Sequence, residues 1–106
     1  MQSSTVLFAQ NARAKVCLVQ GASRGLGLAL TRELAARGDV VFAGCRSPHS
    51  ATALHELREA FPRSVEVLRI DSTEPSSIAS AAAELLAHPL ASGHLDLLLN
   101  TAGVLQ

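Results

Sequence analysis

The chain has 106 residues, with nine Lys and Arg, nine Asp and Glu, and a formal net charge of zero. This length suits a single domain, and the neutral charge, with three Phe and no Tyr or Trp, argues against a nucleic-acid partner. No apolar run approaches the ~20 residues of a membrane-spanning helix, so we expect no insertion into a membrane.

Residues 1–14 show no hydrophobic periodicity, and we interpret them as a flexible N-terminal extension. Their acid-poor, Ser-containing composition is also that of organelle transit peptides, so organelle targeting stays open as the alternative to a cytoplasmic location. Cys17 and Cys45 fall at opposite ends of the sheet predicted below and should not form a disulfide. Free thiols favour a reducing compartment such as the cytoplasm.

The continuous apolar run Val16–Val19 predicts a central parallel strand that is buried on both faces. Three glycines follow within seven residues, and a helix then runs over about residues 24–37. Such a turn aims the helix N-terminus, with its free N–H groups, at the space above the strand, where a phosphate is favoured. Gly21 permits the sharp turn, Gly25 leaves room for a pyrophosphate, and Gly27 lets the helix lie close to the sheet.

The helix over residues 24–37 is amphipathic, and Gly38 ends it. The short apolar run Val40–Ala43 then predicts a second strand. Strand, helix and strand form a βαβ unit with a right-handed crossover. The helix residues expected to face the sheet are Leu26, Ala29, Leu30 and Leu34.

Arg46 follows the second strand, at the point where the adenosine ribose of a dinucleotide is usually recognised. An NAD site carries an Asp or Glu there, but no acidic residue lies between Asp39 and Glu56. Arg24, in the glycine turn, adds a second guanidinium, and such groups bind phosphate through a planar fork of donors. The two arginines favour NADP(H) over NAD(H); the alternative is that Arg46 is a solvated loop residue.

Four further elements complete the predicted fold. A helix over residues 51–60 buries Leu54, Leu57 and Phe61, a strand over 65–70 lies at the sheet edge, a helix runs over 75–87, and a strand follows over 95–99. We expect the helix over 75–87 to bury Ile78, Ala82, Leu85 and Leu86.

This order of elements predicts an α/β fold, a Rossmann-type parallel sheet with strand order 3-2-1-4 that is truncated after the fourth strand. The first two helices cover one face and the third covers the other. The leucines of residues 95–99 would then lie on an open edge strand.

Three motifs lie in order along the chain: the turn Gly21-x-x-x-Gly25-x-Gly27, Asp71 after the third strand, and Asn100-Thr-Ala-Gly103 after the fourth. Together they resemble the short-chain dehydrogenase/reductase family, whose cofactor loop reads Thr-Gly-x-x-x-Gly-x-Gly and which carries an Asn-Asn-Ala-Gly element. The resemblance runs from residue 15 to the C-terminus and covers the N-terminal half of a family member. Gln20 and Thr101 stand where the family has Thr and the second Asn.

The resemblance implies roles for the matching residues. Asp71 would accept a hydrogen bond from the adenine amino group, Ser72 would line the same pocket, and the turn from Asn100 would leave room for the nicotinamide ribose. From spacing alone, Asp71 caps a turn and residues 100–103 are an ordinary strand exit. The loop over residues 44–48 looks most like the carbonyl-reductase and C-factor branch. The expected cofactor-binding residues are Gly21, Ser23, Arg24, Gly25, Leu26, Gly27, Arg46, Asp71, Ser72, Asn100, Ala102 and Gly103.

Members of this family transfer hydride between a nicotinamide and a carbonyl or alcohol, with a Tyr and a neighbouring Lys as acid and base and a Ser beside them. This chain contains no Tyr, and Lys15, its single Lys, lies at the wrong end of the first strand. We therefore predict that residues 15–106 form a partial NAD(P)-binding Rossmann domain. It would be the NADP(H)-binding part of an oxidoreductase, without catalytic residues of its own and inactive alone.

Two alternatives stay open. The chain is a non-enzymatic interaction protein that pairs through its open sheet edge with a full-length relative or with itself, or it is a product that does not fold. The four histidines lack the i, i+4 spacing of a metal site, so no metal site is predicted.

Overall fold

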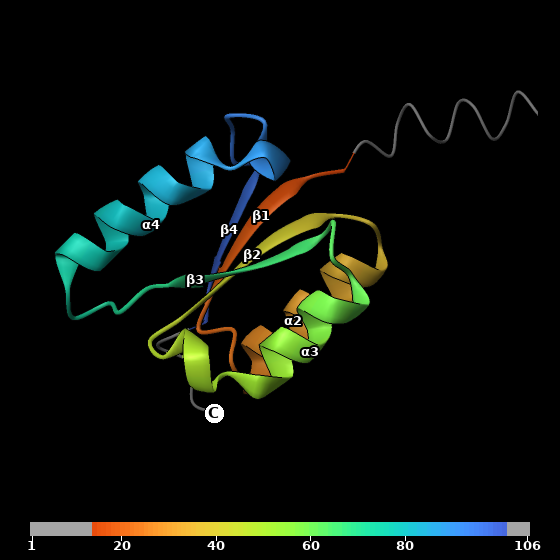
Figure 1. Ribbon diagram of the computed structural model, residues 1–106, viewed down its shortest axis with the longest axis horizontal. Coiled ribbons are helices and arrows are strands. Elements are labelled where there is room, and N and C mark those ends of the chain that lie inside the picture. The colour runs from red at the N-terminus through yellow and green to blue at the C-terminus, as the bar shows by residue number, and fades with distance from the viewer. Residues whose placement is uncertain (1–13, 102–106) are drawn as a thin grey trace, which may run out of the picture.

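The computed structural model describes residues 14–101 as a parallel sheet with helices on both faces (Figure 1). The strands are β1 (Val16–Gln20), β2 (Val40–Cys45), β3 (Val65–Arg69) and β4 (Leu97–Asn100), in the order β3-β2-β1-β4. The α-helices are α2 (Gly25–Ala36), α3 (Thr52–Ala60) and α4 (Pro75–Ala87), and the short 3-10 helices are η1 (Pro48–Ser50) and η2 (Pro89–Ala91). The predicted Rossmann-type α/β fold and its strand order are confirmed.

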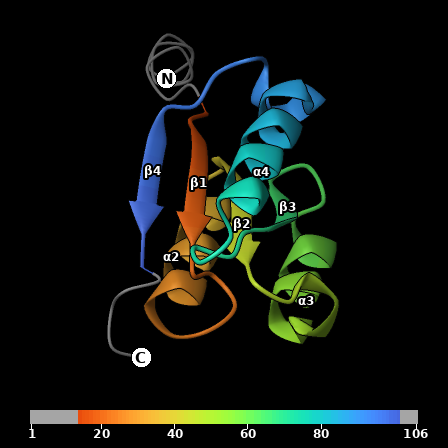
Figure 2. The same ribbon diagram turned by 90° about the vertical axis from the view of Figure 1, so that its left-hand side faces the viewer.

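The helices divide between the two faces of the sheet as predicted (Figures 1 and 2). Helices α2 and α3 cover one face, where Val19, Val41 and Leu54 are fully buried in the core. Helix α4 covers the other face, where Phe42 and Leu68 form the core with side chains of the helix. The residues before 14 and after 101, which include the proposed N-terminal extension, lie outside the described part of the chain.

The parallel register brings the carboxyl ends of the strands to one edge of the sheet. Gln20 at the end of β1 pairs with Gly44 of β2 and with Asn100 of β4. At the opposite edge, two carboxylates accept backbone N–H groups at the start of β1, from Lys15 to Asp39 at 3.0 Å and from Val16 to Asp96 at 2.8 Å. The loops that follow β1, β2 and β3 therefore emerge side by side.

The buried face of α2 differs from the prediction. Leu26 is 48% exposed and Ala29 is also exposed, whereas Gly27 and Thr31 face the sheet together with Leu34. Two contacts explain the difference: the first turn packs directly on the loop after β1, and the Thr31 hydroxyl donates to the Gly27 carbonyl at 2.8 Å. The apolar pattern of the helix alone does not contain this information.

The buried face of α4 differs from the prediction by one position. Leu85 is buried as expected, but the residues beside it on the core face are Ser77 and Ala81. Ile78 and Leu86 are 46% and 51% exposed, and Ala82 is exposed as well. The Ser77 hydroxyl binds the backbone of Asp71 just after β3, and the small Ala81 permits close packing. These two contacts, rather than the burial of the most apolar face, set the rotation of the helix about its axis.

The edge strand β4 carries the apolar surface that was expected. Leu97 and Leu99 pack partly against the core under α2 and α3, while the intervening Leu98 is 57% exposed. The strand begins at Leu97 rather than at Leu95.

Cys17 and Cys45 are buried free thiols, and the second of them lies within β2 rather than after it. Within residues 14–101, no helix is long and apolar enough to cross a membrane.

Candidate functional site

The glycine turn between β1 and α2 uses a left-handed backbone at two positions, with φ of 79° at Gly21 and 57° at Gly25. The Gly44 carbonyl accepts both the Gly21 and the Ala22 N–H, each at 3.0 Å, so the turn is bound to the end of β2. These two N–H groups serve the fold. The N–H groups that an α-helix leaves without an intrahelical acceptor belong to the first turn of α2, and they are the ones suited to a phosphate.

Gly27 lies where the first turn of α2 meets the end of β1. A Cβ placed at this residue would lie 2.0 Å from the Gly21 carbonyl oxygen and 2.7 Å from the Thr101 hydroxyl. Any side chain at residue 27 would therefore overlap the backbone of Gly21. The predicted role of this glycine, close approach of helix to sheet, is consistent with this geometry.

Thr101 binds the end of β1 from the end of β4. Its N–H donates to the Gln20 carbonyl at 2.9 Å, and its buried hydroxyl lies 2.7 Å from the same carbonyl and 3.1 Å from that of Gly21. In the sequence, Thr101 is recognisable only as a departure from the Asn-Asn-Ala-Gly element. Asn100 is exposed at the end of β4, and Ala102 and Gly103 lie outside the described residues.

The three loops after β1, β2 and β3 enclose a cleft of about 300 Å³. It brings together six of the predicted residues, namely Gly21, Ser23, Arg24, Arg46, Asp71 and Ser72. Four further lining residues were missed: Gln20, Cys45, Ile70 and Thr73. Each of these is the sequence neighbour of a predicted residue. Gln20, Cys45 and Ile70 also end a strand or directly follow one, which was the available signal. Gly25, Leu26 and Gly27 lie at the start of α2, next to the cleft-lining Arg24.

A second hollow of about 240 Å³ adjoins this cleft and shares Ser23, Arg24 and Arg46 with it. Its remaining lining residues are Ser47, Ser50, Ala51 and Thr52, at the beginning of α3. Both arginines are exposed, and neither forms an ion pair with any residue in the described range 14–101. Two guanidinium groups, several hydroxyls and a helix N-terminus together make a surface suited to an anion.

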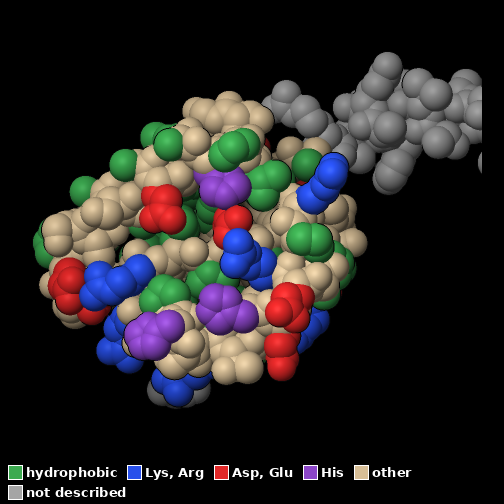
Figure 3. Space-filling view, viewed as in Figure 1, with side chains coloured by type: hydrophobic (Ala, Val, Ile, Leu, Met, Phe, Trp, Pro, Cys, Tyr) green, Lys and Arg blue, Asp and Glu red, His purple; other side chains and the backbone are tan. Residues whose placement is uncertain are grey.

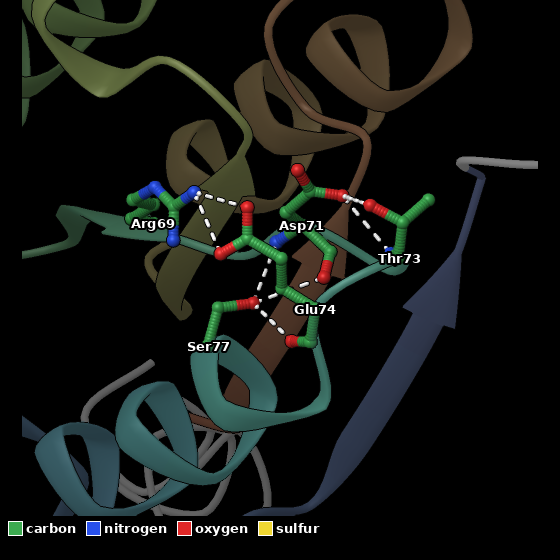
Figure 4. A network of polar contacts seen from close by, with 5 residues as sticks. All are labelled: Arg69, Asp71, Thr73, Glu74 and Ser77. Atoms are coloured by element: carbon green, nitrogen blue, oxygen red, sulfur yellow. Dashed lines mark hydrogen bonds and ion pairs between the residues drawn. The ribbon is translucent and has the colours of Figure 1, made fainter.

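Asp71 caps the turn that follows β3 (Figure 4). Its Oδ1 accepts the Thr73 hydroxyl at 2.6 Å and the Thr73 N–H at 2.9 Å. These hydrogen bonds, and to a smaller extent the positive charges of Arg69 and Arg46, lower the pKa of Asp71 below its ordinary value. The carboxylate is therefore ionised at neutral pH, and it can only accept hydrogen bonds.

Other reactive side chains of the described residues serve the fold. Burial raises the pKa of the Cys45 thiol, so this cleft residue is a protonated thiol at neutral pH rather than a nucleophile. His55 contacts the Pro48 carbonyl at 2.6 Å, and His88 contacts Glu66 at 3.2 Å. Among residues 14–101, no three His, Cys, Asp or Glu side chains are arranged to hold a metal ion.

Comparison with known proteins gives matches over nearly the whole chain. Residues 15–106 match the sequence model of the family described as short chain dehydrogenase. The 3-oxoacyl-(acyl-carrier-protein) reductase FabG of Escherichia coli is 36% identical over 94 residues, which are 89% of this chain and 36% of that protein.

Two solved structures share the fold. A short-chain dehydrogenase from Streptomyces avermitilis is 37% identical with a TM-score of 0.71, over 81% of this chain and 29% of that one. A short-chain dehydrogenase/reductase from Burkholderia multivorans, solved with bound NADP, is 34% identical with a TM-score of 0.70, over 82% of this chain and 36% of that one. The chain thus spans about a third of the length of these proteins.

The contact at Gly27 generates a stability prediction. Replacing a helical glycine by alanine ordinarily favours the helix by about 1 kcal/mol. Here the new Cβ meets backbone, so we expect Gly27→Ala to lower the free energy of unfolding by at least ~2 kcal/mol in urea denaturation. Gly44→Ala is the matched control, because the atoms nearest to its Cβ belong to the Ile70 side chain rather than to backbone, and the substitution should cost less than half as much. Equal stability of the Gly27→Ala variant and the natural chain would contradict the contact.

Proposed function

The chain belongs to the short-chain dehydrogenase family, and we propose that residues 15–106 are the NADP(H)-binding part of an oxidoreductase of this family. The whole enzyme would transfer hydride between the cofactor and a carbonyl or alcohol. The observation that carries the proposal is the cleft at the carboxyl edge of the sheet, where the turn that leads into α2, two arginines and the ionised Asp71 lie around one space.

The proposed cofactor position follows the polar groups of the cleft. The pyrophosphate would lie at the first turn of α2, with Ser23 as a hydroxyl donor. The adenosine would occupy the 300 Å³ cleft between Arg46 and Asp71, beside Ser72. The nicotinamide end would extend toward Asn100, at the end of β4. Each of these groups lies at the same edge of the sheet because the strands are parallel and in register.

The 2′-phosphate of NADP(H) would occupy the 240 Å³ hollow between Arg24 and Arg46, at the beginning of α3. The bound NADP of the Burkholderia multivorans relative makes this cofactor a reasonable ligand to test. An NAD(H) site would need a carboxylate for the ribose hydroxyls, and no acidic residue lines this hollow. Charge-assisted hydrogen bonds from a guanidinium to a phosphate are shorter and stronger than those between neutral groups.

Hydride chemistry is supplied by the nicotinamide when the cofactor is bound. The residues of this chain bind and orient the cofactor, and we assign none of them a catalytic role. The one lysine, Lys15, precedes β1 and so lies at the sheet edge opposite the cleft. The two buried free thiols fit a cytoplasmic location, which we propose.

A second candidate function is pairing with another chain of the same fold through β4. This strand is at the edge of the sheet, and Leu98 is 57% exposed. Hydrophobic side chains also lie along the outer surface of α4 (Figure 3), where Ile78 and Leu86 are about half exposed. An open edge strand with exposed leucine is a template for adding a strand, so a second copy or a longer relative would bind there.

Arg46→Asp tests the cofactor assignment. We expect the ratio of NADPH to NADH affinity to fall about 10- to 100-fold, because the variant loses a charge-assisted hydrogen bond to the 2′-phosphate and gains a carboxylate that suits ribose hydroxyls. Isothermal titration calorimetry with both cofactors measures the ratio. Arg63→Asp is the control, because this exposed arginine precedes β3 at the opposite edge and should leave the ratio unchanged. An unchanged ratio in Arg46→Asp would remove Arg46 from the site.

Leu98→Lys tests the pairing surface. The natural chain should show a sedimentation coefficient that rises with concentration, and the lysine should abolish this rise by placing a charge on the edge strand. Leu26→Lys is the matched control, because Leu26 is exposed to a similar degree but lies on α2 at the opposite face of the sheet. If the natural chain sediments as a monomer at every concentration, β4 is not a pairing surface.

A further inference from the structure

Ser77 is a buried hydroxyl that binds the main chain of a cleft residue from outside the cleft. It lies in the first turn of α4 with 6% of its surface exposed (Figure 4). Its Oγ accepts the Asp71 N–H at 2.9 Å, and the Asp71 and Glu74 carbonyls lie 2.9 and 2.8 Å away. A hydroxyl has one hydrogen, so it donates to one of these carbonyls at a time. Both backbone polar groups of Asp71 therefore meet the same side chain.

The remaining contacts of Asp71 complete its placement. The Glu74 N–H donates to the Asp71 carbonyl at 2.9 Å and closes the turn, while Thr73 holds Oδ1. Within residues 14–101, Oδ2 is the one polar atom of Asp71 that has no hydrogen bond. The nearby ion pair of Arg69 with Glu74 is about half exposed and contributes little, whereas the Ser77 hydroxyl is a buried contact of this turn.

We infer that Ser77 is a positioning residue for base recognition: it holds Asp71 so that Oδ2 accepts the amino group of adenine and disfavours a purine with a carbonyl at that position. The inference rests on the proposed function. An ionised carboxylate accepts and cannot donate, so it attracts an amino group and repels a carbonyl oxygen. Selectivity of this kind requires a fixed carboxylate, because a mobile one turns away from the unfavourable partner.

The test compares NADPH with its deamino analogue, in which hypoxanthine replaces adenine. Calorimetry on the natural 106-residue chain should give NADPH a preference of about tenfold, the value of one charge-assisted hydrogen bond. Ser77→Ala should reduce the preference to less than about threefold. Ser80→Ala, an exposed serine on the same helix, should leave it unchanged. A full preference in Ser77→Ala would overturn the inference.

Two isosteric variants separate the hydroxyl from packing and carry the test if Ser77→Ala does not fold. Ser77→Thr keeps the hydroxyl and should keep the preference, whereas Ser77→Val has the same shape without the hydroxyl and should lose it. Equal preferences in this pair would overturn the inference. In an Asp71→Asn background, Ser77→Ala should cause no further loss, because Ser77 acts through the Asp71 carboxylate. A further fall in the NADPH preference in this background would show that Ser77 acts through another contact, which would overturn the inference.

Failure of the proposed function gives a different result. If the natural chain binds neither cofactor, the NADP(H) proposal fails and the role of Ser77 fails with it. If the natural chain binds both cofactors equally, dinucleotide binding stands, but base recognition through Asp71 and Ser77 is refuted.

Discussion

Helix α2 lies over the end of β1 because residue 27 has no side chain. Any Cβ at Gly27 would overlap the Gly21 carbonyl. The hydroxyl of Thr101, at the end of β4, binds this carbonyl and that of Gln20. The first turn of the helix, whose N–H groups have no intrahelical acceptor, is thereby held at the carboxyl edge of the sheet. The location of the cleft follows from this contact, since the loops after β2 and β3 end at the same edge.

Two hydrogen-bonding groups outside the cleft hold the loops that form its other walls. The Gly44 carbonyl binds the glycine turn to β2, and the Ser77 hydroxyl binds the turn after β3 to α4. The two arginines at the cleft stay exposed and are available to an anionic ligand. A rigid backbone with exposed charge is suited to a cofactor that carries several phosphates.

Sequence patterns predicted the strand order and six cleft residues because these depend on local spacing: apolar runs mark strands, and polar residues directly after them mark the functional edge. The patterns failed where a tertiary contact decided the outcome. Helix α4 has two adjacent faces that could pack on the sheet. The face with Ser77 and Ala81 is buried, although the face with Ile78 and Leu86 is more apolar. Thr101 was likewise missed because its partners are carbonyls some 80 residues away.

The location of the bound cofactor is tested most directly by titrating the isotopically labelled 106-residue chain with NADPH and following its amide NMR signals. Binding as proposed shifts the signals of residues 23–27 at the start of α2, residues 46–52 before and at the start of α3, and residues 71–73 after β3. Signals at the opposite edge, near Lys15 and Asp39, should stay in place. Absence of shifts, or shifts confined to that opposite edge, would contradict a dinucleotide site at the carboxyl ends of the strands.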